Sequence, residues 1–381
     1  MKNVKVILIH NTIAPYRHPL FEELSKKVDL MVYYCSVKHS FRKWDLWPRN
    51  YDYKYKLLPG ITIKTPIGEF SFNPAIIKEV VKNIPQVIII SGYVDPTMWT
   101  AFIVGKLLKI PIIYWTEEIR EPRSIVGIVT KPIRYLFIKK SNALIAQGKR
   151  TKEFLESWGV HSDRIFIAHN SVDNDLYIHL SQEIRRNRNN IRNMLGFHEK
   201  HLLLFVGQLI PRKGISDLIQ IYMKVKKRKK DLALIIIGSG PLKEIILKAI
   251  QEHDLDAVYL IESGISFQDL VKYYSIADIF ILPTLFDLAP LVINEAMACG
   301  LPVIVYDAAG NTDDFIISGL NGYVIRKGDV ESFSESIIRV LDDERLRKRM
   351  SEESIRIITS VGSVNSTVNG FLKSIEYVLR R

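Results

Sequence analysis

The chain has 381 residues, of which 47% are apolar, 25% charged and 10% aromatic. This composition excludes a disordered, collagen-like or coiled-coil chain, and the length predicts two domains of roughly 150 to 200 residues each. The net charge is +12, with 26 Lys and Arg against 16 Asp and Glu in residues 1–180, and 27 against 25 in residues 181–381. The excess of base in the first half is typical of a surface that meets a phosphorylated ligand, nucleic acid or anionic lipid.

Short runs of β-branched and leucine residues recur along the chain, each followed by an amphipathic segment of helical length. In the first half these runs are residues 4–10, 86–91, 110–115, 143–147 and 165–170. In the second half they are residues 201–207, 232–238, 258–263, 279–283 and 302–307. Continuous apolar strands that alternate with helices are typical of parallel sheets covered on both faces. The sequence therefore predicts an α/β protein with two Rossmann-like, doubly wound domains.

Composition also predicts the domain limits. Residues 1–170 form the first domain, and residues 171–195, which are polar, rich in Asn and basic, have the composition of a linker. Residues 196–360 form the second domain. Residues 361–381 return to helical periodicity and are expected to form a terminal helix that can cross back onto the first domain.

Two features bear on the compartment. The two cysteines, Cys35 and Cys299, are too far apart in sequence for a disulfide framework or a metal cluster, which indicates a reducing compartment. The N-terminal apolar run has no small-residue cleavage site, and no stretch reaches the roughly 18 apolar residues of a spanning helix. We therefore expect a cytoplasmic protein that contacts the cytoplasmic face of a membrane at most peripherally.

The most informative run is residues 279–305, in which a strand, a loop and a helix succeed one another. Asp287 lies in the loop, and Glu295 lies one to two turns inside the helix. Free backbone N–H groups and the helix dipole favour an anion at this edge of the sheet, so the two carboxylates flank a phosphate site that fits a nucleotide sugar. The residues around this helix start are Leu288, Ala289, Pro290 and Leu291.

Two further runs carry chemistry. FVGQLIPRKGI places Gly207 after a buried strand, and the cations Arg212 and Lys213 just before a helix. Small residues let the backbone approach a ligand, and paired cations suit a diphosphate. NGYVIRKGDV is a turn, a short strand and a helix N-cap at Asp329.

Three motifs, GQLIPRKG, the D-x7-E run that ends EAMACGLPVIV, and NGYVIRKGD, have the order and spacing of family-four retaining glycosyltransferases, the group 1 family. The chain resembles that family over nearly its whole length. NSVDNDLY is similar to its domain-crossing segment, and APYRHPLFEEL to the first loop and helix of its polysaccharide-synthesis branches. The resemblance implies a GT-B fold, with the acceptor on the first domain, the nucleotide sugar on the second and a cleft between them.

The resemblance also implies roles for single residues. Lys213 and a neighbouring basic residue would hold the donor diphosphate, Glu295 would bind the ribose hydroxyls, and Asp287 would grip the transferred sugar. Gly207 and Gln208 would complete the donor site. Neither a metal nor a cofactor is implied, since cations and helix N–H groups take the place that a divalent ion has elsewhere.

The chain departs from the family pattern at three positions. Asp287 stands where Glu is usual, which shortens the side chain by roughly 1.5 Å and bears on the sugar or its pose. Gln208 stands where Arg is usual and removes one charge that faces phosphate, which Arg212 can partly replace. Many relatives have a His after strand 110–115, where this chain has Glu117. That difference bears on the acceptor.

Loops at the carboxyl ends of parallel strands are where such folds bind ligands. In the first half these loops offer four acceptor-side residues, although the tyrosine can equally be a packing residue. They are Tyr16, Arg17, Asp95 and Glu117.

Each donor-side residue also has a purely structural interpretation. Glu295 could be a solvent-facing helix carboxylate, Lys213 a solvated lysine ahead of a helix, and Asp287 the N-cap of the following helix. The metal-like pattern at residues 173–175 is better explained by turn and cap chemistry. Residues 124–140, which mix apolar and basic side chains, fit either interfacial membrane contact or a core-packing helix.

We therefore expect a retaining, metal-independent glycosyltransferase of the hexosyltransferase type. It would move a sugar from a UDP-linked donor to a glycan or lipid-linked glycan in polysaccharide or glycoconjugate biosynthesis. The alternative is an inactive nucleotide-sugar-binding partner subunit of a glycosyltransferase complex, and a phosphorylase or epimerase of the same fold is also open. A nucleic-acid binder, which charge alone would allow, is not expected. An anionic acceptor at a membrane surface would explain the basic first half.

Overall fold

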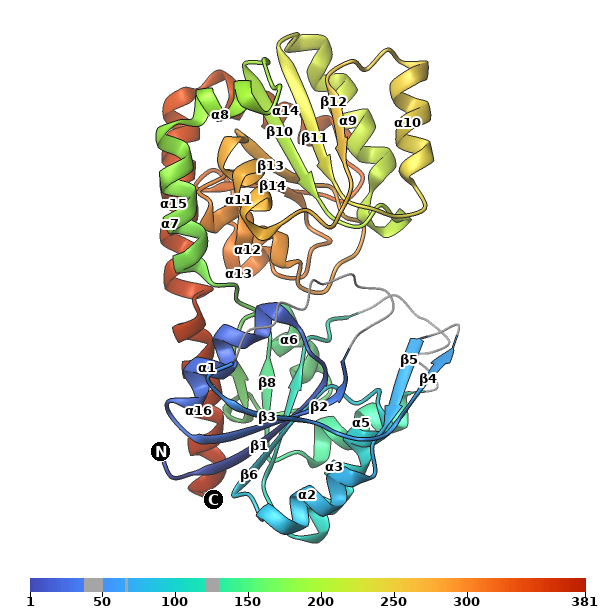
Figure 1. Ribbon diagram of the computed structural model, residues 1–381, viewed down its shortest axis with the longest axis vertical. Helices are drawn as coiled ribbons and strands as arrows, with labels where there is room; N and C mark the ends of the chain where they lie inside the picture. The colour runs from blue at the N-terminus through green and yellow to red at the C-terminus, as the bar shows by residue number, and fades with distance from the viewer. Residues whose placement is uncertain (38–50, 66–67, 121–129) are drawn as a thin grey trace. The chain divides into compact units, whose positions relative to one another are not determined.

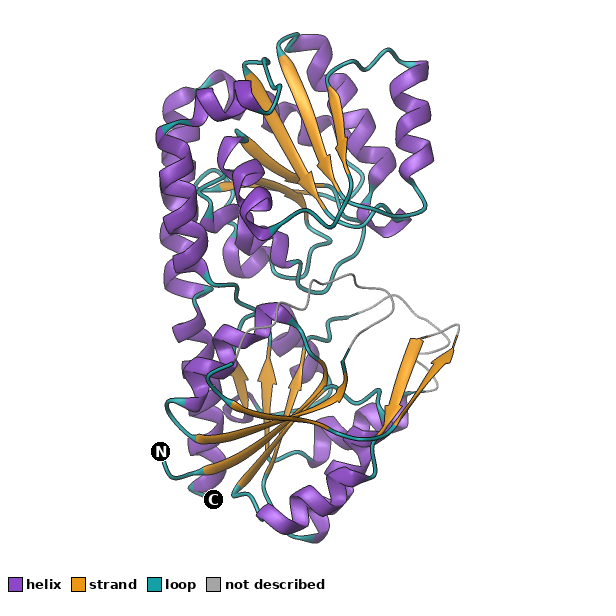
Figure 2. Cartoon of the chain, in the orientation of Figure 1, coloured by secondary structure: helices purple, strands orange, loops and turns teal. Residues whose placement is uncertain are grey.

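The computed structural model describes residues 1–37, 51–65, 68–120 and 130–381. The chain forms two compact units: unit 1 contains residues 1–171 and 364–381, and unit 2 contains residues 172–363. Each unit is built on a parallel sheet with helices packed against it (Figures 1 and 2). The predicted α/β class with two Rossmann-like domains is confirmed.

Unit 1 holds a seven-stranded sheet in the order β3-β2-β1-β6-β7-β8-β9, in which every neighbouring pair is parallel. The strands are β1 (Lys5–Thr12), β2 (Asp29–Ser36), β3 (Lys54–Leu57), β6 (Val87–Ser91), β7 (Ile112–Thr116), β8 (Ala143–Ala146) and β9 (Ile165–Ile167). Strands β4 (Ile61–Thr65) and β5 (Gly68–Phe72) form a separate antiparallel pair. Five of the seven sheet strands coincide with apolar runs in the sequence.

Helices cover both faces of the unit 1 sheet. One face carries α2 (Ala75–Asn83), α3 (Pro96–Leu107), α5 (Lys131–Lys140) and α6 (Lys149–Ser157), and the other carries α1 (His18–Ser25) and α16 (Val364–Leu379). The C-terminal helix α16 packs in this core through Phe371, whose ring lies 4.9 Å from that of Trp115. Of the segment 124–140, residues 124–129 lie outside the described residues, and 131–140 form α5.

Unit 2 holds a six-stranded parallel sheet in the order β12-β11-β10-β13-β14-β15. The strands are β10 (His201–Val206), β11 (Leu232–Ile237), β12 (Val258–Ile261), β13 (Ile279–Leu282), β14 (Val303–Tyr306) and β15 (Gly322–Ile325). Its helices are α7 (Asn174–Arg186), α8 (Arg188–Met194), α9 (Ile215–Arg228), α10 (Lys243–Glu252), α11 (Phe267–Ile276), α12 (Leu291–Ala298), α13 (Thr312–Phe315), α14 (Val330–Asp342) and α15 (Glu344–Val361).

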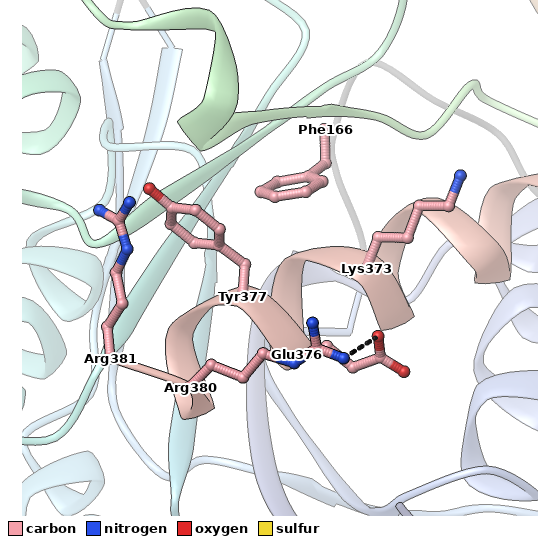
Figure 3. Close-up of a pocket in the computed structure, with 6 residues that line it drawn as sticks. All are labelled: Phe166, Lys373, Glu376, Tyr377, Arg380 and Arg381. Carbon is pink, nitrogen blue, oxygen red and sulfur yellow. Dashed lines mark ion pairs between the residues drawn. The ribbon is translucent and has the colours of Figure 1, made fainter.

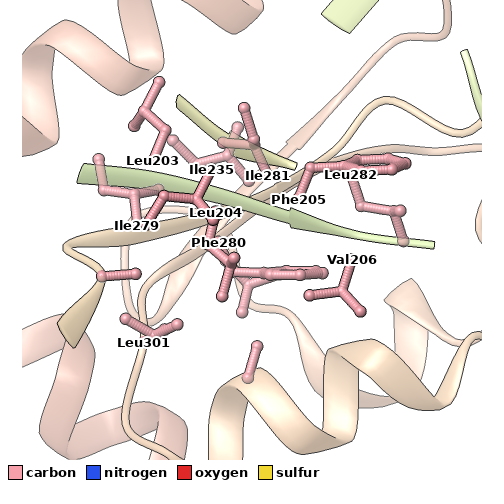
Figure 4. Packing of buried hydrophobic residues seen from close by; sticks show 14 of the residues in the cluster. Leu203, Leu204, Phe205, Val206, Ile235, Ile279, Phe280, Ile281, Leu282 and Leu301 are labelled. Atoms are coloured by element: carbon pink, nitrogen blue, oxygen red, sulfur yellow. The ribbon is translucent and has the colours of Figure 1, made fainter. Parts of the chain in front are cut away.

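The centre of unit 2 explains why its strands read as unbroken apolar runs. Every residue of β10 and β13 is buried, because each strand has neighbours on both edges and side chains covered on both faces. Phe205 of β10 and Ile281 and Leu282 of β13 belong to one hydrophobic cluster, and the two β13 side chains point to opposite faces of the sheet (Figure 4). The sheet thus fixes where the polar loops that follow these two strands begin.

Residues 174–194, which lie within the expected linker, are helical and belong to unit 2. Asp173 caps α7 by accepting the N–H of Leu176 at 3.1 Å, which matches the cap interpretation of this acidic pattern. In α8, the guanidiniums of Arg188 and Arg192 each lie 2.9 Å from a carboxylate oxygen of buried Asp278. The basic residues that gave the segment its linker composition therefore anchor it to unit 2.

Candidate functional site

The predicted donor residues lie where the strand order of unit 2 reverses. Strand β10 pairs with β11 on one side and with β13 on the other, so the connections after β10 and β13 leave in opposite directions. In open parallel sheets, ligands bind at the carboxyl ends of the strands at such a switch point. The loops that follow these two strands, residues 207–214 and 283–290, contain most of the predicted donor-site residues.

The two loops are held directly against each other. The carbonyl oxygen of Arg212 accepts the backbone N–H of Leu285 at 2.8 Å and the hydroxyl of Thr284 at 3.0 Å. Gly214 has a φ of +69°, and a Cβ at this position would lie 1.8 Å from the carbonyl oxygen of Pro283. Only glycine therefore permits this close approach of backbones.

Lys213 and Asp287 meet across the two loops. Lys213 ends a short 3-10 helix (Pro211–Lys213), is 7% exposed and pairs with the carboxylate of Asp287, which also lies 3.5 Å from the guanidinium of Arg212. Helix α12 is preceded by Pro290 at its N-cap and has no side-chain cap. Asp287 is thus not the N-cap, and its carboxylate instead joins both predicted diphosphate-binding cations.

The loop after β14 supports the backbone around Asp287. Sequence reasoning missed this supporting loop. The N–H of Gly310 donates to the carbonyl of Asp287 at 2.8 Å, and the side-chain amide of Asn311 donates to the carbonyl of Pro290 at 3.2 Å. A Cβ on Gly310 would lie 2.0 Å from the carbonyl oxygen of Leu288. A Gly-Asn pair just after an apolar strand is the signal that could have pointed to this support.

The backbone between Asp287 and α12 offers hydrogen-bond donors. Among the residues that the structure describes, the N–H groups of Leu288 and Ala289 donate to no acceptor, and Leu291 stands at the first helical position, where the N–H has no partner within the helix. The positive end of the α12 dipole lies at the same place. This edge therefore combines two cations with several N–H groups, which suits an anion.

Glu295 lies on α12 and is bound by two buried tyrosines. It accepts a hydrogen bond from the hydroxyl of Tyr274 at 2.7 Å, and the hydroxyl of Tyr177 also bonds to it. Burial raises the pKa of Glu295, and these two hydrogen bonds counteract the rise. Glu295 is therefore not a free surface carboxylate. The tyrosines come from α11 and α7, and no pattern in the sequence predicts their contact with Glu295.

The remaining donor-side residue, Gln208, lies on the loop after β10 and is exposed, and Gly207 beside it is half-buried. The carbonyl of Gln208 accepts the N–H of Ile210 at 3.0 Å, which shapes the turn towards Arg212. The structure thus brings Lys213, Arg212 and Asp287 into direct contact and places Gln208 on the surface of the same loop.

In unit 1, two of the four predicted acceptor-side residues are joined through a third side chain. Arg17 is 4% exposed, and its guanidinium stacks 4.3 Å from the ring of Trp115 and 4.8 Å from that of Tyr16. With its amide turned to suit its neighbours, Gln147 accepts from Arg17 at 3.0 Å and donates to the carboxylate of Glu117 at 3.1 Å. Glu117 itself is exposed. This cluster lies after β1, β7 and β8, at the carboxyl edge of the sheet.

Asp95, the fourth of these residues, is buried and engaged elsewhere. Its carboxylate accepts the N–H of Ser71 at 2.6 Å, which ties β5 to the start of α3. Burial raises the pKa of Asp95 to about 6, and the bond from Ser71 counteracts part of the rise. The structure therefore gives Asp95 a role in holding the β4–β5 hairpin.

A cavity of about 460 Å³ lies in unit 1, between β9 and the last turns of α16 (Figure 3). Phe166 and Tyr377 form its apolar wall, with Lys373 and the C-terminal arginines at its rim. It contains none of the predicted donor or acceptor residues, and it is open to solvent. The candidate site is therefore carried by the loops at the sheet edges and not by this cavity.

Comparison with known proteins identifies relatives of this chain. Residues 187–356 match the family model described as glycosyl transferases group 1. The chain is 23% identical to the alpha-D-kanosaminyltransferase of Streptomyces kanamyceticus over 66% of its length and 67% of the relative's. It is 25% identical to the sulfoquinovosyl transferase of Arabidopsis thaliana over 75% of its length and 55% of the relative's.

Solved structures share the fold over the whole chain. The Anabaena protein HepE, crystallised in complex with UDP, has a TM-score of 0.78 at 14% identity and matches 98% of this chain and all of that one. A glycosyltransferase from Rickettsia africae has a TM-score of 0.77 at 15% identity, with both chains fully covered. At identities this low, the structural similarity establishes the two-domain fold that the proteins share.

Proposed function

Because the chain is a group 1 glycosyltransferase with a GT-B fold, we propose that it transfers a sugar from a UDP-linked donor to a hydroxyl of a glycan or lipid-linked glycan, with retention at the anomeric carbon. Unit 2 binds the donor and unit 1 binds the acceptor. The observation that carries this proposal is the contact between Lys213 and Asp287 at the switch point of unit 2.

The diphosphate of the donor binds between the cations and the start of α12. The ammonium group of Lys213 has three N–H donors, so its contact with Asp287 leaves donors for phosphate oxygens. Arg212, which is exposed, and the N–H groups of Leu288 and Ala289 supply further contacts. The similar HepE protein binds UDP, which supports a uridine nucleotide.

Glu295 accepts the ribose hydroxyls. A carboxylate has about four acceptor positions, and the hydroxyls of Tyr274 and Tyr177 use two of them. These two bonds hold the carboxylate in one orientation, so the ribose meets an acceptor that is already in place. The raised pKa of Glu295 also makes donor binding sensitive to acid.

In the reaction, the bond from the anomeric carbon to the diphosphate oxygen breaks, and a bond to the acceptor oxygen forms on the same face. The proton of the acceptor hydroxyl passes to the leaving phosphate. Lys213 and the N–H groups stabilise the negative charge that grows on the leaving diphosphate, without a metal ion. Asp287 accepts hydrogen bonds from the transferred sugar while Arg212 stays beside it.

The acceptor binds at the carboxyl edge of the unit 1 sheet, where Glu117 is exposed and Gln147 links it to Arg17. We place the enzyme in polysaccharide or glycoconjugate biosynthesis in the cytoplasm, with its acceptor presented at the membrane face. Among the described residues, no helix is both long and apolar enough to cross a bilayer.

A second candidate function is an inactive, donor-binding partner subunit. Gln208 favours it, because this residue replaces the usual Arg and leaves one cation fewer near the phosphates. Transfer or hydrolysis of the donor sugar by the isolated chain would rule the partner subunit out, and donor binding without either reaction would support it.

The test is a thermal-shift screen of the purified chain against UDP-, GDP- and ADP-linked sugars. A ligand that binds only the native state raises the melting temperature, and we expect a UDP-sugar to do so. Glu295→Ala should remove the shift, and Glu331→Ala, which changes an exposed carboxylate in the first turn of α14, should keep it. An unchanged shift in Glu295→Ala would contradict the site.

A further inference from the structure

Helix α3 of unit 1 presents an apolar stripe to solvent. Trp99, Ile103 and Leu107 follow one another at four-residue spacing and are 36%, 54% and 77% exposed. At this spacing the three side chains lie on one side of the helix. The opposite side packs in the core through Met98 and Phe102. Helix α3 is therefore apolar on both sides, although only one of them is buried.

Helix α2 repeats this arrangement. Ile77, Val81 and Ile84, the last of these at the C-cap, are 44%, 50% and 67% exposed. Their spacing again places them on one side, and Ile76 and Val80 on the other side are buried in the same core as α3. Two neighbouring helices thus each leave an apolar stripe uncovered by the described residues.

The two stripes belong to one surface. Helices α2 and α3 lie side by side on the same face of the sheet (Figure 1). Each precedes a strand of a parallel sheet, so they run in the same direction. Their starts are tied together by Thr97, whose hydroxyl accepts the N–H of Asn73 at 2.8 Å. We call these six exposed residues the α2–α3 surface.

The β4–β5 hairpin adds to this surface at its edge. Ile61 and Phe72 are directly opposite each other in the hairpin and are 68% and 44% exposed. Asp95 and Thr97 hold the hairpin against the start of α3 through the N–H and carbonyl of Ser71. The hairpin's apolar pair therefore stays next to α3.

The charge around the α2–α3 surface is positive. Four exposed lysines lie on α2, on α3 or just after it, and none makes an ion pair with a described carboxylate: Lys78, Lys82, Lys106 and Lys109. The two acidic residues between 73 and 110 are both engaged. Glu79 pairs with Lys56 at 2.5 Å. Asp95 is buried, and its carboxylate accepts the N–H of Ser71.

We propose that the α2–α3 surface binds the interface of an anionic lipid bilayer. Apolar side chains enter the boundary between headgroups and acyl chains, and the lysines reach the phosphates with their ammonium groups while their stems stay apolar. In a two-fold dimer formed through this surface, the same four lysines of the two copies would face one another. Repulsion between these like charges disfavours a second copy as the binding partner. An anionic lipid surface buries the apolar side chains and also pairs its phosphates with the lysines.

The test uses the full chain and sedimentation with vesicles of phosphatidylcholine, with and without half phosphatidylglycerol. We expect binding to the anionic vesicles and little to the neutral ones, and weaker binding at 1 M salt. The double variant Ile103→Glu, Leu107→Glu should bind anionic vesicles at least about tenfold more weakly. The matched control Ile245→Glu, Leu247→Glu alters two exposed apolar residues of α10 in unit 2 and should bind like the unchanged chain.

Because all four altered positions are exposed, the melting temperatures of both variants should stay near that of the unchanged chain. Equal binding by the α3 variant, or no binding to anionic vesicles, would overturn the proposal. A concentration-dependent dimer in light scattering that the α3 substitutions abolish would also overturn it, because a second copy would then be the occupant. Donor binding is measured separately, so a failure here is distinct from a failure of the proposed function.

Discussion

The two units have the same kind of interior and different surfaces. Each is a parallel sheet with a switch point, at β1 and β6 in unit 1 and at β10 and β13 in unit 2. By sequence, unit 1 holds 29 Lys and Arg against 15 Asp and Glu, whereas unit 2 holds 24 against 26. Of the large apolar residues that are exposed in the described chain, 18 lie in unit 1 and 5 in unit 2. The two units therefore share a fold that their cores explain, and their surfaces differ in charge and in exposed apolar area.

Four cations of unit 2 are held at fixed positions by carboxylates. Lys213 and Arg212 contact Asp287, and Arg188 and Arg192 contact Asp278. In unit 1 the lysines beside α2 and α3 are exposed and have no carboxylate partner among the described residues. A placed cation suits one small anionic ligand, and a set of unpaired surface cations suits an extended anionic surface.

The largest expected effect tests the donor role of unit 2. Lys213→Ala should slow sugar transfer about 10³-fold, because the leaving diphosphate loses its buried cation. The control is Lys243→Ala, which removes an exposed lysine that pairs with Glu262 in the same unit. Initial rates measured at saturating donor decide the matter, and a loss of less than about threefold would mean that Lys213 has only a structural role.

The next effect concerns stability and α8. Asp278→Ala should lower the free energy of unfolding by about 3 kcal/mol, since it leaves Arg188 and Arg192 without their carboxylate. Asp342→Ala, which removes an exposed partner of Lys229, should cost less than about 1 kcal/mol. Urea unfolding of the two variants compares them, and equal losses would contradict the anchoring role of Asp278.

The pH dependence of Asp278 has a definite sign. Burial tends to raise its pKa, but Arg188, Arg192 and the N–H of Leu202 outweigh burial and hold the pKa below its usual value. A lowered pKa means that the stabilisation is present above the unfolded value of 3.8 and is lost as the pH falls through the folded value. Asp278→Ala should therefore remove part of the acid sensitivity of unit 2.

Unit 1 has a buried acid that behaves in the opposite way. The pKa of Asp95 is raised to about 6 from 3.8, so its contribution is full below 3.8 and is lost as the pH rises through about 6. Asp95→Asn keeps an oxygen for the N–H of Ser71 and should raise the free energy of unfolding at pH 8 by about 2 kcal/mol. Denaturant unfolding at pH 4 and pH 8 measures this, and a variant as pH-dependent as the parent would contradict it.

The smallest effect tests how Glu295 is oriented. Tyr274→Phe removes one buried hydroxyl and should cost about 1 kcal/mol of stability, with donor binding a few-fold weaker. The control Tyr273→Phe alters the half-buried neighbour and should leave donor binding unchanged. If calorimetric titration with a UDP-sugar gives the same affinity for both variants, Tyr274 does not position Glu295.

Much of the fold could be predicted, because buried parallel strands are continuous apolar runs. Strand β2 was missed because it is rich in tyrosines, and these are buried only with partners far away in sequence, such as Glu79 for Tyr33. The linker composition of residues 171–195 misled for the same reason. The partner of Arg188 and Arg192 is Asp278, more than eighty residues further on.

The site could be predicted in part. The positions of Lys213 and Asp287 after two apolar strands indicated the sheet edge, but their contact depends on which strands are neighbours. The contact of Glu295 with Tyr274 depends likewise on α11 and α12 both packing against α7. Helix periodicity revealed neither tyrosine, since a buried tyrosine has the same spacing as any core residue.

The central claim is that the donor binds to unit 2 at the loops after β10 and β13. Backbone hydrogen exchange of the full chain, followed with and without a UDP-sugar, tests this most directly. We predict slower exchange in residues 207–214 and 284–295 and no change in residues 11–17 or 91–95 of unit 1. Slower exchange confined to the unit 1 loops, with residues 207–214 unaffected, would contradict the account.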